Sequence, residues 1–122
     1  MTIDECLCRV DGLKPNPFTR AEKLGWLNAL EGMVKAQILD THMGPEVPFT
    51  PYDPDTPGDT VLLVGKPWED MYLHWLESRM DYYSGDIARY NNAVQMFRSF
   101  YDGFSAQYNR EHMPKGRGWK YF

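Results

Sequence analysis

An acidic stretch in the middle of the chain has the strongest appearance of a chemical site. Residues 53–59 combine aspartates with a glycine in the way a calcium-binding loop begins. Such a loop needs acidic ligands at its first, third and fifth positions and a bidentate glutamate at its twelfth. Here the fifth position is Pro57 and the twelfth is Val64, and neither side chain can bind a cation. We therefore expect a solvated acidic loop and no calcium site.

The histidines and the remaining carboxylates follow patterns of ordinary structural groups. His42, His74 and His112 fall in three different elements, and only His74 has a second ligand-type side chain, Glu77, at helical spacing. Glu77 and Asp81 are four residues apart and could do acid–base work, but nearby cations favour plain surface ion pairs. No serine stands in a nucleophile-elbow context. We expect no catalytic residue, no metal and no cofactor.

Composition limits the cellular setting and the domain count. A chain of 122 residues with 43% hydrophobic residues is large enough for one domain with its own core. Cys6 and Cys8 lie two apart on a predicted helix, so they point in different directions and should be free thiols. The net charge of -4 argues against a dedicated nucleic-acid binder. Apolar runs are too short for a membrane span, and the basic-then-apolar order of a signal peptide is missing, so we expect a soluble cytoplasmic protein.

The spacing of apolar residues predicts an all-α fold, a small bundle of about four helices. Threonine–glutamate capping boxes begin helices over about 2–11 and 20–39. A third helix should begin at Pro67, because a proline suits the first helical turn, and should end at residues 84–85. Asp86 then caps the fourth helix.

The fourth helix carries the clearest pattern in the chain, an apolar seven-residue repeat sustained over about 25 residues. Because only a short turn separates helices three and four, we expect a long antiparallel helical hairpin. A coiled coil with another chain is the alternative. The repeat consists of Ile87, Tyr90, Val94, Phe97, Tyr101, Phe104 and Tyr108.

A proline-rich inter-helix loop over 41–66 separates helices two and three. Its prolines recur at every third residue from 45 to 57, the period of a polyproline II helix, which predicts a stiff strut about 40 Å long. We expect it to lie outside the core, as an arm over the body or onto a neighbouring subunit; a docking ligand of SH3 type is the alternative. The short apolar run 61–64 is either a small strand or an extended segment fixed to the core. The candidate partner-binding residues here are Pro48, Phe49, Pro51 and Tyr52.

Residues 113–122 form an extended, basic and aromatic C-terminal tail behind the helical domain 1–112. Cations and aromatics are common interface anchors, so we expect an arm that grips a neighbour. Folding back as a lid over the helical hairpin is the alternative. The candidate partner-binding residues are Arg110, Lys115, Arg117, Trp119, Lys120, Tyr121 and Phe122.

Several short runs resemble a known family. They are Val-Asp-Gly-Leu-Lys-Pro-Asn at 10–16, Lys-Leu-Gly-Trp-Leu-Asn-Ala-Leu-Glu at 23–31, and scattered matches between 70 and 101 such as Arg-Tyr-Asn-Asn at 89–92. Together they resemble small proteins encoded beside capsid genes in tailed phages and prophages of Gram-positive bacteria. Those proteins are usually assigned as head–tail connector, or head-completion adaptor, proteins. The similarity covers most of the chain except the proline-rich loop and the last ten residues.

The resemblance implies a structural virion protein rather than an enzyme. It implies an adaptor that is made in the host cytoplasm and assembles as a ring below the portal, at the virion neck. The expected partners are the portal protein, a downstream neck or tail component, other copies of the chain, and DNA that passes without sequence-specific binding; no membrane is involved. The alternative is a small helical regulatory or inhibitor protein of a mobile element that binds one host protein.

Overall fold

A computed structural model describes residues 1–115 and confirms the all-α fold. Within this part of the chain there are four α-helices, one π-helical turn and no β-strand. No helix of the described residues is both long and apolar enough to span a bilayer. The elements in chain order are α1 Ile3–Leu13, α2 Arg20–Val34, the π-helical turn η1 Lys35–Leu39, α3 Met71–Ser84 and α4 Ile87–Glu111.

Local capping explains where most helices begin. The Thr2 hydroxyl accepts the backbone N–H of Glu5, and Thr19 with Glu22 forms a complete capping box at the start of α2. α2 passes without a break into η1, so the predicted helix 20–39 has the right bounds but finishes with a π turn. Gly85, with φ 77°, ends α3 in the left-handed conformation that glycine adopts at little cost. Asp86 then caps α4 as predicted.

The predicted start of the third helix is wrong. α3 begins at Met71, and residues 65–70 form successive turns with i to i+3 hydrogen bonds. The indole N–H of Trp68 donates to Gln107 on α4, and its ring lies against Gly103. This contact holds residues 65–70 against α4, and the first helical turn forms only after it.

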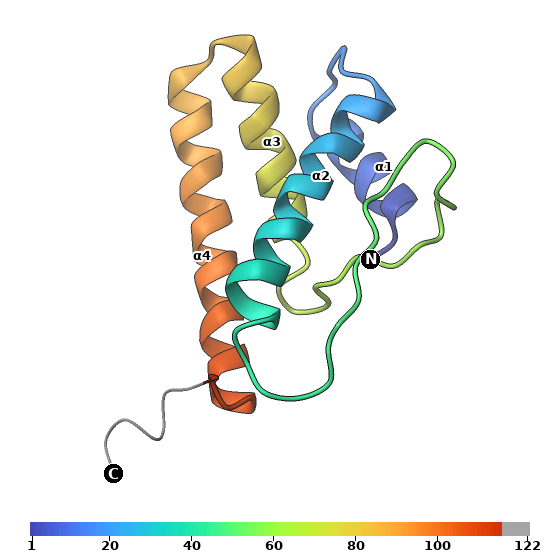
Figure 1. The fold of residues 1–122 in the computed structure, drawn as a ribbon. Helices are drawn as coiled ribbons and strands as arrows, with labels where there is room; N and C mark the ends of the chain where they lie inside the picture. Colours follow the sequence, from blue (N-terminus) through green and yellow to red (C-terminus); the bar gives the residue numbers. More distant parts are fainter. Residues whose placement is uncertain (116–122) are drawn as a thin grey trace.

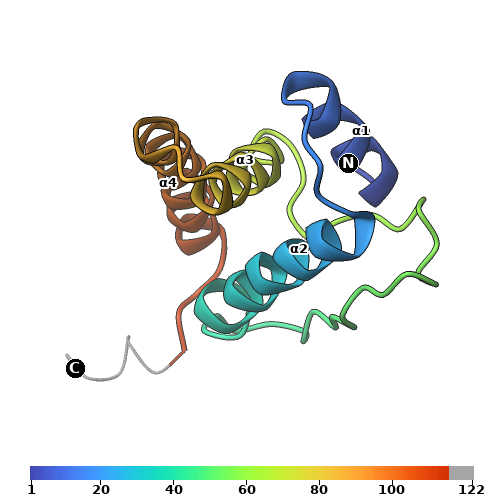
Figure 2. The ribbon, with the colours of Figure 1, turned by 90° about the horizontal axis from the view of Figure 1, so that it is seen from above.

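α3 is the central helix of the bundle. It forms an antiparallel hairpin with α4, while α1 and α2 pack against other sides of it (Figure 1). Half of its 14 residues are buried, whereas α4 buries only Ala93 and Phe97 of its 25. Seen from above, α3 lies beside α4, between α4 and α1, whereas α2 lies apart from α4 (Figure 2). The predicted helical hairpin is therefore confirmed, but α4 is a peripheral helix with much of its surface uncovered.

The segment after the proline-rich region is attached to the start of the chain. The N–H of Ile3 donates to the carbonyl of Thr60, and the N–H of Leu62 donates to the carbonyl of Met1, both at 3.0 Å. Leu62 and Val64 are buried in the core. Of the two alternatives for residues 61–64, the structure has the extended segment fixed to the core.

Candidate functional site

Tyr52, predicted to bind a partner, lies in the core. Its side chain is 7% exposed, and its hydroxyl donates to Glu31 at 2.7 Å. The Asn28 side chain bonds both the backbone N–H and the backbone carbonyl of Tyr52, at 2.7 and 2.8 Å. The expectation that the proline-rich loop stays outside the core is therefore wrong at this residue. Glu31 on α2 needs buried donors, and the loop supplies one of them.

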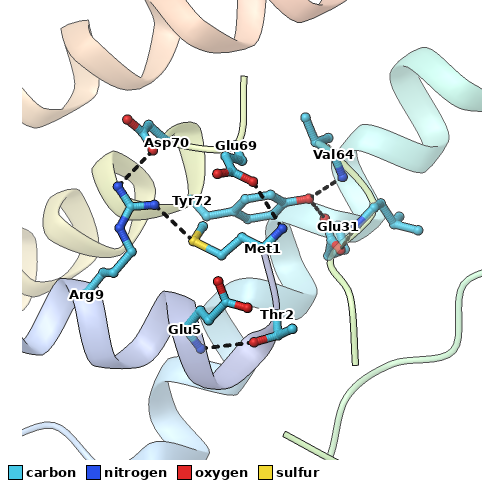
Figure 3. Close-up of polar contacts among 10 residues, drawn as sticks. Met1, Thr2, Glu5, Arg9, Glu31, Val64, Glu69, Asp70 and Tyr72 are labelled. Atoms are coloured by element: carbon cyan, nitrogen blue, oxygen red, sulfur yellow. Dashed lines mark hydrogen bonds and ion pairs between the residues drawn. The ribbon is translucent and has the colours of Figure 1, made fainter. Parts of the chain in front are cut away.

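Glu31 is a carboxylate with no solvent exposure that joins three parts of the fold. It accepts the hydroxyls of Tyr72 at 2.5 Å and Tyr52 at 2.7 Å, and the backbone N–H of Leu63 at 2.9 Å. Figure 3 shows the Tyr72 hydroxyl between Glu31 and the N–H of Val64, which it accepts at 2.9 Å. Burial raises the pKa of Glu31, and the three hydrogen bonds oppose that rise. The cluster connects α2, α3 and the loop, and every group in it is satisfied.

The other loop candidates remain at the surface. Pro48 and Pro51 are exposed, as are all five prolines of the repeat. The half-buried Phe49 packs its ring edge-on against that of Tyr52, with centroids 5.3 Å apart. The loop is not a straight strut, because the N–H of Thr56 bonds the carbonyl of Asp53 in a turn. The period of three therefore predicted the exposure of the prolines but not the path of the chain.

The candidates at the C-terminal end divide into two groups. Arg110 is exposed on the last turn of α4, and the N–H of Lys115 donates to the carbonyl of Thr41 at 2.8 Å. The N–H of Met43 donates to the carbonyl of Met113, so residues 113–115 are fixed beside the end of η1. The remaining candidates lie outside the described residues: Arg117, Trp119, Lys120, Tyr121 and Phe122.

The residues considered first for chemistry are mostly engaged in structural contacts. Asp81 is buried and pairs with Lys14 from the end of α1, so its interpretation as a surface ion pair is wrong. Glu77 pairs with His74 at 3.7 Å. Both cysteines are free, one buried and one exposed. Within residues 1–115 no three His, Cys, Asp or Glu side chains are grouped so that they could hold a metal ion.

The structure contains a groove that the sequence did not predict. It is a hollow of about 450 Å³ between α2–η1 on one side and α4 on the other, with α3 as its floor. Residues of the apolar repeat form the α4 wall of this hollow. Phe97 is buried, but the other repeat residues that line the hollow are only half-buried. We call this hollow the aromatic groove. It is lined by Met33, Gln37, Trp75, Arg79, Tyr90, Val94, Phe97, Arg98, Tyr101 and Asp102.

Arg79 is the distinctive group of the aromatic groove. Its guanidinium carbon lies 4.5 Å from the ring centroid of Trp75 and 5.6 Å from those of Tyr82 and Tyr90. The indole of Trp75 is fixed in turn by a 2.7 Å hydrogen bond to the carbonyl of Trp26. No carboxylate of the described residues lies within 4 Å of Arg79. Arginine, tryptophan and tyrosine are the side chains that most often anchor protein interfaces.

A sequence signal for this site was available. Trp75 and Arg79 are four residues apart on one face of α3, and Tyr90 follows the short turn that closes the hairpin. Their grouping needs only the antiparallel pairing of α3 and α4. What the sequence could not reveal is that α2 leaves the groove open instead of covering it.

A second hollow of about 410 Å³ lies between α1, α3 and α4. Its lining mixes aliphatic side chains with charged ones that are paired, such as Lys14 with Asp81 and Arg89 with Asp86. The aliphatic members are Leu13, Ala93 and Met96. α4 is therefore flanked by two hollows, of which, among the described residues, only the aromatic groove is lined by tryptophan, tyrosine and phenylalanine rings. Comparison of the chain with known protein families, with curated proteins and with solved structures finds no match.

Proposed function

We propose that this chain is a structural virion protein, a head–tail connector that assembles as a ring below the portal. In that role it extends the DNA exit channel and offers a platform to the next neck or tail component. The short runs at 10–16, 23–31 and 70–101, which resemble connector proteins of phages of Gram-positive bacteria, support the proposal. The resemblance implies a helical adaptor, and the described residues form an all-α fold.

The observation that carries the proposal is the row of aromatic side chains on α4, most of which the fold leaves only half-buried. A helix of 25 residues that buries only two of them has a further face to fill. The aromatic groove lies on one side of α4, and the second hollow, which has no tryptophan, tyrosine or phenylalanine of the described residues in its lining, lies on the other. A subunit of a closed ring contacts its two neighbours through two different surfaces, so two unlike faces on one helix suit this geometry.

The charge of the chain suits a channel that DNA passes through. A net charge of -4 gives little counterion-release affinity for the phosphate backbone, so DNA can slide without being held. The role needs no catalytic group. We propose that the basic and aromatic C-terminal residues, beginning at the fixed Lys115, grip a neighbour or the portal.

Light scattering coupled to gel filtration, with and without a purified portal protein, tests this function. A connector should form rings, either alone at high concentration or when the portal is added. A matched variant truncated after Lys115 keeps every described residue, so it should remain folded while losing association. A chain that stays monomeric with the portal present, or that forms only a tight one-to-one complex with a single host protein, would reject the connector role.

A further inference from the structure

The chemistry of the aromatic groove defines what can occupy it. Aromatic side chains line its floor and its α4 wall, and two cations, Arg79 and Arg98, stand against the single carboxylate of Asp102. The half-buried guanidinium of Arg79 stacks on rings but has no carboxylate of the described residues within 4 Å. An occupant should therefore offer apolar surface that packs on aromatic rings, together with negative charge.

The turn at residues 53–59 of this same chain has that chemistry. Its sequence, Asp-Pro-Asp-Thr-Pro-Gly-Asp, places three exposed aspartates around two exposed prolines. Within residues 1–115 none of these aspartates has a cation within 4 Å. Proline-rich segments characteristically dock in grooves lined by aromatic side chains. We call this segment the acidic turn.

The acidic turn is held in one shape before it meets a partner. The N–H of Asp53 donates to the Thr56 hydroxyl at 2.8 Å, and the N–H of Thr56 donates to the carbonyl of Asp53 at 3.0 Å. Tyr52 fixes one end of the turn in the core. The carbonyl of Gly58 fixes the other end by accepting the N–H of Asp4. A ligand ordered in advance loses little conformational entropy on binding.

The position of the turn decides which groove it can enter. In Figures 1 and 2 the loop that contains it projects on the side of α2 that faces away from α4. The aromatic groove lies on the other side of α2, between α2 and α4. The turn therefore cannot fill the groove of its own chain, whereas a second copy can present it from outside.

We infer that the acidic turn of one copy docks in the aromatic groove of the next copy. The prolines pack on the aromatic wall, and the aspartates meet Arg79 and Arg98. Because the two surfaces differ, the contact is head-to-tail, and it generates a ring wherever the rotation between copies closes. The inference rests on the proposed ring-forming role and names the contact between neighbours.

Disulfide trapping in full-length chains tests the contact even where it is weak. One chain carries Arg98→Cys and the other Asp55→Cys, both with Cys8→Ser so that only the buried native thiol remains. Mixed and oxidised, they should give a cross-linked dimer. The matched control pairs Arg98→Cys with Glu111→Cys, an exposed position outside the groove, and should give at most about a tenth of that yield. Equal yields from the two pairs would overturn the inference.

Charge reversal provides a second and independent measurement. Arg79→Glu disables the groove, and Asp55→Asn with Asp59→Asn removes two charges from the turn without making it complementary to the altered groove, so either chain alone should lose association by about tenfold or more. Mixed together they should form a one-to-one dimer and nothing larger, since one intact turn meets one intact groove. The exposed Lys66→Glu, with the same change of charge, should associate as the wild type does.

The outcomes separate this contact from the proposed function. A third pair, Arg98→Cys with Lys115→Cys, tests the C-terminal segment: a yield above that of the Asp55→Cys pair would assign the groove to that segment and overturn the inference. Arg79→Glu rings that form on a portal as readily as wild-type rings would also overturn it, while leaving the connector role intact. Turn–groove dimers in a chain that never binds a portal would support the contact and reject the connector role.

Discussion

Removing the Tyr52 hydroxyl tests whether the proline-rich loop is part of the folded core. Tyr52→Phe keeps the ring but removes one of the three donors to Glu31, a carboxylate with no solvent exposure. If the loop were a free arm, this change would have no effect on stability. Because the hydroxyl is buried against a charged acceptor, we expect a clear loss of stability.

The size of the loss follows from the acceptor. A hydrogen bond to a charged group contributes about 1.5–3 kcal/mol to stability, against about 1 kcal/mol for a neutral pair. Because the carboxylate of Glu31 has no solvent exposure, bulk solvent cannot directly replace the lost hydroxyl. We expect Tyr52→Phe to lower the free energy of unfolding by about 2 kcal/mol at neutral pH. Urea denaturation followed by tryptophan fluorescence measures the difference.

The loss should depend on pH in a defined direction. Burial raises the pKa of Glu31 above its ordinary value, so the native state holds its proton more tightly than the unfolded chain does. Its contribution to stability is fully present below the unfolded pKa and falls as pH rises through the folded pKa. Losing a donor to the carboxylate raises that pKa further. The difference in the free energy of unfolding between the wild type and Tyr52→Phe should therefore be smallest in acid and grow toward neutral pH.

Tyr101→Phe is the matched control. Its hydroxyl donates at 2.6 Å to the neutral side chain of Gln37 in a more exposed setting, so the loss should stay below about 1 kcal/mol and should not change with the charge of Glu31. The reasoning is refuted if Tyr52→Phe costs no more than Tyr101→Phe at neutral pH. It is also refuted if the difference in free energy of unfolding between the wild type and Tyr52→Phe becomes smaller as the pH rises.

Two further predictions concern packing and thiol reactivity. Gly103→Ala should destabilise the fold by about 1–3 kcal/mol in urea titration, because a Cβ at this position would overlap the Trp68 ring. Gly25→Ala, which has open space around it on a helix, should stabilise the fold by up to about 1 kcal/mol. Equal effects of the two substitutions would argue against the Trp68 contact. In a thiol titration of the native protein, the exposed Cys8 should react and the buried Cys6 should not, because burial raises the pKa of Cys6 to about 12. Rapid reaction of both thiols would show that α1 is not packed as described.

Helix positions were predictable because local rules decide them. The capping pair at Thr19 and the Gly85–Asp86 junction fix the chain within a few residues, so the start of α2 and the ends of the hairpin follow from sequence. The start of α3 was missed because contacts of Trp68 with α4, far along the chain, hold residues 65–70 in turns. Periodicity carries no information about such contacts.

The candidate site was less predictable for a related reason. Tyr52 was assigned to a partner because its neighbours are prolines, but its place is decided by Glu31, which lies 21 residues earlier on another element. A charged residue on the apolar side of a predicted helix was the available sign that a donor must come from elsewhere. The aromatic groove depends on the angle at which α2 crosses α3, and side-chain spacing does not encode that angle.

The pairing of residues 58–62 with the first four residues of the chain has a consequence for how the molecule opens. α1 and the end of the loop share hydrogen bonds between Ile3 and Thr60, between Asp4 and Gly58, and between Leu62 and Met1. Neither segment can separate from the bundle without releasing the other, so they form one cooperative unit of local unfolding. The amide protons of Ile3, Asp4 and Leu62 should therefore exchange with solvent through a single opening event, although some sixty residues separate them along the chain.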